Sequence, residues 1–296
     1  MNEPVIRLLA AEDLEGALAL SSTAGWNQRL ADWRMVLSLA PRGSFAAISD
    51  RRIVGTSIGI DYGAFGWIAM MLVDPAYRGR GIGRRLLEAA MSSLPSDRPI
   101  RLDATPLGRP LYQACGFEDE TVLTRHVADG SSRRVVSPPV PHRALPLVRP
   151  LSAADLHVIM EHDAQVFGGS RGRVLEWALG DAPGYAHVIE SEPGPVHYCF
   201  GRHGRLFDQV GPVIAANDEI ARALVTAALR AADDRAVVLD VFDSHTGFSA
   251  WVRECGFAAQ RPLFRMRRPA GQRGPASHDR SRTSLVEFAI LGPEFA

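Results

Sequence analysis

The fold of this protein is decided by residues 67–87, which read WIAMMLVDPAYRGRGIGRRLL. The apolar run Gly66–Val73 predicts a buried strand, and Asp74-Pro75 predicts a turn because proline cannot continue strand pairing. A glycine-rich stretch follows and leads into a helix predicted over Ile82–Leu94, where apolar residues recur at helical spacing. The stretch therefore predicts a strand, a glycine-rich turn and an amphipathic helix, in that order.

The start of this helix has the chemistry of an anion-binding site. The first N–H groups of a helix have no partners within the helix, and the helix dipole places partial positive charge at the same end. Gly79, Gly81 and Gly83 carry no Cβ, so a phosphate group can approach the backbone closely. Three arginines add positive charge to the same stretch: Arg78, Arg80 and Arg84.

Two common nucleotide-binding motifs do not fit this stretch. A P-loop requires Gly-Lys followed by Ser or Thr, and the chain contains no such run. A dinucleotide fingerprint, G-x-G-x-x-G, meets Arg84 when it starts at Gly79 and Leu86 when it starts at Gly81. Asp103 stands about where a ribose-binding acid would, but the loop follows three strands that look antiparallel. A nucleotide-binding oxidoreductase is therefore disfavoured.

A third pattern, Arg-x-x-Gly-x-Gly, is satisfied by Arg78, Gly81 and Gly83. It follows a strand that ends in Val-Asp-Pro and precedes Leu-Leu. In that setting it resembles the pyrophosphate loop of the GNAT superfamily of N-acetyltransferases, and the order of predicted elements over residues 1–128 agrees with that family. The resemblance implies an α/β (α+β) fold with a mixed, mostly antiparallel central sheet flanked by helices.

The same resemblance implies an acetyl-coenzyme A site in the first half of the chain. Strand Gly66–Val73 would pair its backbone with the pantetheine arm of the co-substrate. A backbone N–H near Met71 or Leu72 would hold the thioester carbonyl and stabilise the negative charge that develops there. The residues expected to bind acetyl-coenzyme A are Met71, Leu72, Val73, Arg78, Gly79, Arg80, Gly81, Ile82, Gly83 and Arg84.

Two side chains are candidates for proton transfer. In the GNAT family a tyrosine often precedes the last Gly-Phe strand, and Tyr112 stands at that position. A phenol with a pKa of about 10 could protonate a departing thiolate with a pKa of about 8.5; the alternative is a tyrosine of the core. Asp103, at the end of a predicted strand, is the first candidate for the general base. Its alternative role is local hydrogen bonding; Asp61 and Asp74 are weaker candidates, and a water chain could replace a single base.

The two halves of the chain follow one plan. The order β-α-α-β-β-β-α-β-α-β is predicted for residues 1–128 and again for 147–296, with a proline-rich linker at 129–146. The second half would also hold a mobile loop over 269–284 and a final strand over 285–291. Short matches at similar offsets support a duplication, namely Leu102-Asp103 with Leu239-Asp240, and Cys115-Gly116-Phe117 with Cys255-Gly256-Phe257.

The second half lacks the chemistry of the first. It has no Arg-x-x-Gly-x-Gly, and Asp218 and Glu219 in the first turn of its matching helix would repel a pyrophosphate. Where the first half has Tyr112, the second has Trp251, which cannot act as an acid. The second half is therefore expected to be a degenerate GNAT-like domain that completes the substrate pocket and stabilises the pair, without binding acetyl-coenzyme A.

Composition limits the remaining function classes. The chain carries 33 basic and 33 acidic side chains, which argues against a dedicated nucleic-acid binder. We expect a cytoplasmic protein without signal peptide or membrane span, three free cysteines and no metal site, since His157 and His162 are poorly spaced. Arg265, Arg267 and Arg268 are expected on a solvated strand edge.

The sequence thus predicts an N-acetyltransferase that moves an acetyl group from acetyl-coenzyme A to a primary amine of a small molecule or peptide, by direct attack in a ternary complex. The alternative is a non-catalytic acyl-coenzyme A-binding sensor of the same fold. Monomer and homodimer both stay open.

Overall fold

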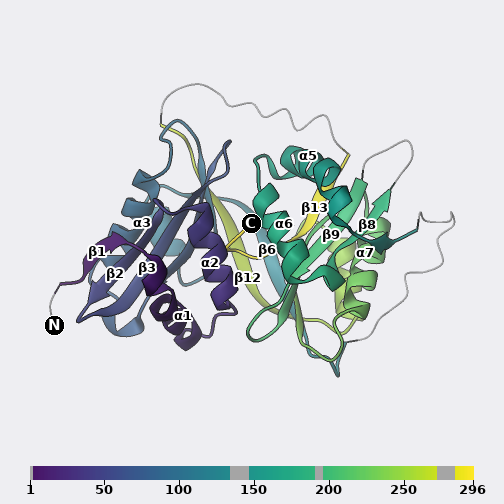
Figure 1. Ribbon diagram of the computed structural model, residues 1–296, viewed down its shortest axis with the longest axis horizontal. Helices are drawn as coiled ribbons and strands as arrows, with labels where there is room; N and C mark the ends of the chain where they lie inside the picture. Colours follow the sequence, from purple (N-terminus) through teal and green to yellow (C-terminus); the bar gives the residue numbers. More distant parts are fainter. Residues whose placement is uncertain (1–2, 134–146, 191–195, 272–283) are drawn as a thin grey trace. The chain divides into compact units, whose positions relative to one another are not determined.

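The computed structural model describes residues 3–133, 147–190, 196–271 and 284–296, and these form two compact units (Figure 1). Unit 1 consists of Met1–Glu120, Phe264–Ala276 and Pro293–Ala296. Unit 2 consists of Thr121–Leu263 and Ser277–Gly292.

The two units differ from the two repeats of the sequence. We call residues 1–128 the first repeat and residues 147–296 the second repeat. The end of the first repeat belongs to unit 2, and two short parts of the second repeat belong to unit 1. Most of the predicted linker (134–146) and of the predicted loop (272–283) lies outside the described residues.

The elements of the first repeat follow the predicted order, and β4 has the predicted bounds. They are β1 (Val5–Leu8), α1 (Leu14–Thr23), α2 (Leu30–Leu39), β2 (Ser44–Ser49), β3 (Arg52–Asp61), β4 (Gly66–Val73), α3 (Ile82–Ser92), β5 (Ile100–Ala104), α4 (Arg109–Ala114) and β6 (Glu118–Ala128).

The second repeat has the same order and one further strand. Its elements are β7 (Arg149–Pro150), α5 (Leu156–Phe167), α6 (Gly172–Asp181), β8 (His187–Glu190), β9 (Val196–Arg202), β10 (Asp208–Ala215), α7 (Asp218–Arg230), β11 (Val237–Phe242), α8 (Thr246–Glu254), β12 (Ala258–Arg268) and β13 (Val286–Ile290).

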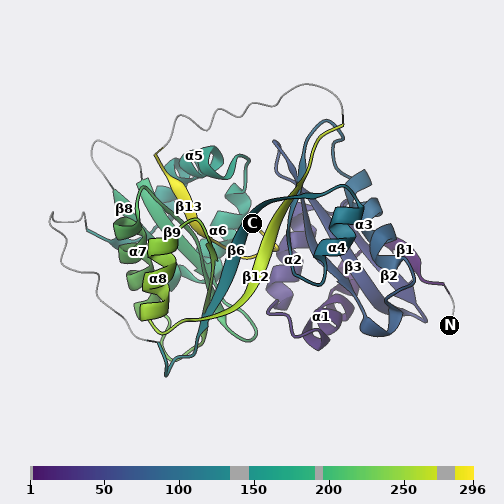
Figure 2. The ribbon, with the colours of Figure 1, turned by 180° about the vertical axis from the view of Figure 1, so that it is seen from behind.

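The sheet of unit 1 has the order β1-β2-β3-β4-β5-β12. Its neighbouring strands are antiparallel except β4 and β5, which are parallel. Helices cover both faces: Ile53 packs against Gly16 of α1, whereas its neighbour Val54 shares a buried cluster with Ile82 and Leu86 of α3. Figure 1 shows α1 and α2 on one face, and Figure 2 shows α3 and α4 on the other.

Strands β4 and β5 are paired only at their beginnings. The register joins Gly66 to Ile100 and Trp67 to Arg101, and no further pair of residues joins the two strands within the described chain. From Ile68 onward, β4 therefore keeps β3 on one side and leaves a gap toward β5 on the other. This gap is where the resemblance places the acyl donor.

The backbone of β4 is irregular beside this gap. The register with β3 shifts between Thr56 and Ile58, and Met70 has a positive φ of 51°. The hydroxyl of Thr56 donates to the Met70 carbonyl at 2.7 Å. A bulge re-aims the backbone groups around it, and backbone strain of this kind concentrates at functional sites.

The sheet of unit 2 has the order β6-β11-β13-β10-β9-β8-β7. Its parallel pair, β10 and β11, is joined at Asp208–Val237 and Gln209–Val238 and then separates, as β4 and β5 do. Here, however, β13 lies in the space between the two strands and pairs antiparallel with both. Unit 2 therefore has no open gap at this position.

The repeats exchange β6 and part of β12. Residues Phe264–Arg268 of β12 pair with β5 in unit 1, and β6 pairs with β11 in unit 2. An arginine on each exchanged strand stands opposite an aspartate. The two pairs are Arg265 with Asp103, through two bonds of 2.9 Å, and Arg125 with Asp240, through two bonds of 2.7 Å.

Both carboxylates of these pairs are fully buried. Burial alone would raise the pKa of Asp240, but the guanidinium of Arg125 holds this pKa below its usual value. The expectation that Arg265 lies on a solvated edge is wrong, because its side chain is buried against Asp103. Arg267 and Arg268, one pleat further, are exposed as predicted.

Candidate functional site

The helix start that the sequence singled out is an open, uncapped N-terminus. Gly81 is the N-cap of α3, with a φ of 75°, and no side chain caps this helix end. Gly79 has a φ of 76°, and a Cβ added at either glycine would meet no atom within 4 Å. Because L side chains avoid this conformation, glycine is required here, and the space above the backbone is free for a ligand.

Strand β4 and helix α4 hold the start of α3 in place. A Cβ on Gly83 would make ordinary contact with Leu111, Met71 and Val73 at 3.4–3.7 Å. Asp74 accepts a hydrogen bond from the Ala76 N–H at 2.9 Å and so fixes the turn between strand and helix. The turn role of Asp74 is thus directly visible, whereas nothing in the structure favours it as a base.

Three exposed arginines surround the open helix end. Arg78 donates to the Val73 carbonyl at 3.1 Å, and Arg80 donates to the Ala76 carbonyl at 3.2 Å. Arg84, on α3 itself, donates to the Ala114 carbonyl at 3.3 Å. Arg84 also lies 4.0 Å from Glu88. Each guanidinium has five N–H donors, so these contacts orient it without exhausting its capacity to bind an anion.

Tyr112 lies in the buried cluster on the same face of the unit 1 sheet as α3. The cluster contains Ile68 of β4 and Ala104 of β5, which flank the gap, and half-buried Met71 packs against it. No described residue makes a hydrogen bond to the Tyr112 hydroxyl. Burial raises the pKa of Tyr112 well above its usual value, and the nearby Cys115 raises it further. The phenol is therefore held in its protonated form.

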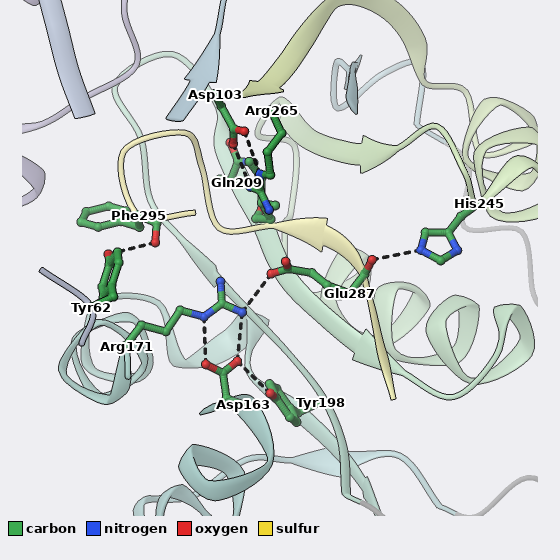
Figure 3. Close-up of polar contacts among 11 residues, drawn as sticks. Tyr62, Asp103, Asp163, Arg171, Tyr198, Gln209, His245, Arg265, Glu287 and Phe295 are labelled. Atoms are coloured by element: carbon green, nitrogen blue, oxygen red, sulfur yellow. Dashed lines mark hydrogen bonds and ion pairs between the residues drawn. The ribbon is translucent and has the colours of Figure 1, made fainter. Parts of the chain in front are cut away.

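The geometry of Asp103 favours local hydrogen bonding over the role of general base. Both of its oxygens accept hydrogen bonds from Arg265 (Figure 3). A carboxylate held in a bidentate pair must break a strong contact before it can accept a proton. Asp61 is engaged as well, since it accepts from the Gly63 N–H and forms an exposed ion pair with Arg98.

The matching helix end in unit 2 is closed. The Asn217 side chain caps α7 by accepting from the Ile220 N–H at 3.0 Å. Asp218 in the first turn forms an ion pair with Arg222 at 3.5 Å. The donor that an anion would need is therefore used internally, and a carboxylate stands beside it.

The gap of unit 2 is filled by β13 at close range. A Cβ on Gly211 of β10 would clash with the Ile290 carbonyl of β13, so glycine is needed where the two backbones meet. The Gln209 side chain donates to the same carbonyl at 3.2 Å. Trp251, which replaces the tyrosine of the first repeat, is buried in the core of unit 2.

A buried ionic network fastens β13 in unit 2 (Figure 3). Arg171 donates to both oxygens of Asp163 and to Glu287 of β13, at 2.9 Å each. Tyr198 donates to Asp163 at 2.8 Å, and His245 contacts the Glu287 carbonyl at 3.0 Å. The strand is thus held by side chains as well as by its pairing.

The sequence did not reveal β13 in the gap, the strand exchange, or the support of Met70 by Thr56. One signal for the exchange was present, because Arg125 and Arg265 each follow the phenylalanine of a Gly-Phe pair by eight residues. Among the described residues, no group of His, Cys, Asp and Glu is placed to hold a metal ion. None of the described helices is long and apolar enough to cross a membrane.

Two family models match the chain, and both are described as "Acetyltransferase (GNAT) domain". One matches residues 41–119 and the other residues 159–279. Each model thus covers a large part of one repeat.

Known proteins match the chain over most of its length. The uncharacterized N-acetyltransferase YitH of Bacillus subtilis is 26% identical over 258 residues, which cover 84% of this chain and 86% of that protein. A solved Pyrococcus horikoshii protein classed with the acetyltransferases has a TM-score of 0.71 at 21% identity and covers 99% of this chain and 96% of its own. A tandem GNAT protein from the clavulanic acid biosynthesis pathway has a TM-score of 0.62 at 18% identity, with 92% and 100% covered.

Proposed function

Because the chain belongs to the GNAT acetyltransferase superfamily as a protein with two GNAT domains in tandem, we propose that it is an N-acetyltransferase with one acetyl-coenzyme A site. The site lies in unit 1, and the acceptor is a primary amine of a small molecule or peptide. The protein acts in the cytoplasm, as a monomer or homodimer.

The observation that carries this proposal is the contrast between the two gaps. In unit 1 no described strand pairs between β4 and β5 beyond their first two residue pairs, and the helix that follows β4 begins with an uncapped, glycine-lined end. In unit 2 the equivalent gap holds β13, and the helix end is capped by Asn217. The first arrangement fits a pantetheine arm along β4 and a pyrophosphate at the helix N–H groups, whereas the second has β13 and the Asn217 cap in these places.

The residues of unit 1 fit the donor in both parts of the site. Acetyl-coenzyme A supplies the acyl group as an activated thioester. The N–H groups of Gly79–Gly83 would bind the pyrophosphate, with Arg78, Arg80 and Arg84 as the surrounding positive charges. Met71, Leu72 and Val73 would offer backbone groups to the pantetheine arm along the open edge of β4.

Catalysis would rest on holding the thioester and the amine together, and on two polar groups of the chain, a backbone N–H of β4 and the Tyr112 hydroxyl. A backbone N–H near Met71 or Leu72 would stabilise the charge that develops on the carbonyl oxygen as the amine nitrogen attacks. As the new C–N bond forms and the C–S bond breaks, Tyr112 would donate its proton to the departing thiolate. Water would accept the proton of the substrate ammonium group, because Asp103 is engaged by Arg265.

Calorimetry with acetyl-coenzyme A tests the proposal. We expect one binding site per chain and release of free thiol when a suitable amine is added. Two sites would contradict the assignment of unit 2, and the absence of binding would contradict the acetyltransferase assignment. Binding without thiol release from any amine in a broad panel would favour a non-catalytic acyl-coenzyme A sensor.

A further inference from the structure

Residues Pro293–Ala296 form a buried segment of unit 1. We call it the 293–296 segment. Of the total surface of Glu294 and Phe295, only 3% and 0% respectively are exposed. Two side chains of unit 1 hold its backbone. The Trp67 indole donates to the Pro293 carbonyl at 3.0 Å. The Tyr62 hydroxyl donates to the Phe295 carbonyl, also at 3.0 Å (Figure 3).

The segment contacts the face of the sheet that lies opposite α3 and α4. Ile68 and Leu102 belong to the buried cluster beneath those helices. Since side chains alternate along a strand, Trp67 and Asp103 point to the other face. Arg265 agrees with this placement, because its guanidinium lies over the Trp67 ring at 5.1 Å from the ring centre.

This face is the side from which an acceptor would approach. The open end of α3 and the Tyr112 side chain lie on the other face, so the donor would enter the gap from there. An amine that attacks the thioester must then come from the side of Trp67.

The position of Trp67 places the segment at the narrow end of the gap. Trp67 is the last residue of β4 that pairs with β5. A strand rises about 3.3 Å per residue, so Met71 lies about 13 Å further along β4. The 293–296 segment therefore lies on the acceptor side beside the closed end of the gap, about 13 Å along β4 from the predicted point of attack.

We propose that the 293–296 segment bounds the acceptor side at the narrow end of the gap and limits the acceptor to a compact amine, one that extends no more than about 13 Å beyond its reactive nitrogen. This inference rests on the proposed acetyltransferase function. It selects a small-molecule amine over an extended peptide, because a peptide of several residues would have to pass through the space that Phe295 fills.

The test compares the full chain with a chain lacking residues 293–296. Both are assayed by thiol release with acetyl-coenzyme A and two acceptor series, linear diamines and peptides of increasing length. We expect the full chain to use only the short members. The deletion should raise kcat/KM for the long members by about tenfold or more while the Kd for acetyl-coenzyme A, measured by calorimetry, stays unchanged.

A point variant covers the case in which the deletion unfolds unit 1. Tyr62→Phe removes one hydrogen bond to the segment and should shift the length profile in the same direction, though less. Tyr198→Phe in unit 2 removes a matched buried hydrogen bond, to Asp163, and should leave the profile as it is.

The outcomes separate this inference from the proposed function. Activity with an unaltered length profile in both variants, or equal use of long peptides by the full chain, would overturn the role of the segment alone. Absence of thiol release with every amine, from both the full chain and the deletion, would overturn both proposals.

Discussion

The residue on which the donor site depends most is Gly81. Its positive φ and the free space above it allow a phosphate to reach the helix end, and a glutamate there would add strain, bulk and negative charge at once. We expect Gly81→Glu to abolish detectable acetyl-coenzyme A binding in calorimetry. Gly168→Glu is the matched control, because Gly168 has a φ of 79° and open space but lies at the end of α5.

The control should lose a similar amount of stability, about 1 kcal/mol, and keep full binding. Equal loss of binding in both variants would show that strain, and not the site, is responsible.

Tyr112 carries the prediction on proton transfer. Tyr112→Phe should lower kcat by about 10²-fold or more and leave the Kd for acetyl-coenzyme A unchanged. Because burial raises the pKa of Tyr112, the phenol stays protonated up to about pH 10, and the loss should be the same factor at every pH below that value.

Tyr185→Phe serves as the control for Tyr112. It removes a buried hydroxyl that donates to Asp208 at 2.7 Å in unit 2, so it should reduce stability and leave kcat unchanged. If Tyr112→Phe keeps full kcat, Tyr112 is a core residue and does not donate a proton in the reaction.

Single residues were predictable from the sequence where their role is local. Gly79 and Gly81 could be found because a helix end next to glycines is a local feature of the chain. The partner of Asp103 could not be found in this way, since Arg265 follows it by 162 residues and meets it only through strand pairing. The available sign in the sequence was that Arg125 and Arg265 stand at the same offset from the Gly-Phe pair of their repeats.

At the scale of elements, helices and strands were predictable because their apolar spacing depends on a few neighbouring residues. The placement of β13 was not. An apolar run such as Leu285–Leu291 pairs equally well at an edge or between two strands, and its own sequence carries no sign of either. The bulge at Met70 likewise arises from the register of two strands.

The network around Arg171 gives a prediction on how firmly β13 is held. Glu287→Gln removes one of two carboxylates from a fully buried guanidinium, and we expect it to lower the free energy of unfolding by about 1–3 kcal/mol. Urea denaturation measures the change. Glu3→Gln is the comparison, because the Glu3–Arg85 pair is exposed and should contribute less than about 1 kcal/mol.

Equal, small effects in the two variants would mean that pairing alone holds β13. A clearly larger loss in Glu287→Gln would assign that stability to the network.

At the scale of the whole molecule, the strand exchange makes the repeats depend on each other. The first repeat alone would lack the strand beside β5, and the buried Asp103 would lose Arg265. A buried charge without its partner costs about 3–5 kcal/mol, and an unpaired strand edge favours aggregation. We therefore expect residues 1–128, expressed alone, to show no cooperative unfolding and no acetyl-coenzyme A binding.

Co-expression of residues 1–128 with residues 147–296 provides the control. The pair should copurify and recover the donor site, as measured by calorimetry. A first repeat that folds and binds acetyl-coenzyme A by itself would contradict the dependence.

The exchange also sets an order of events during synthesis. Multidomain chains commonly fold from the N-terminus while the ribosome is still adding residues. Unit 1 cannot complete its fold in this way, because its sheet includes Phe264–Arg268 and its interior includes the 293–296 segment. The sheet of unit 2 likewise requires β13, which lies in the same stretch of the chain. Both units must therefore remain incomplete on the ribosome until residues 264–296 have emerged, and they become complete almost together.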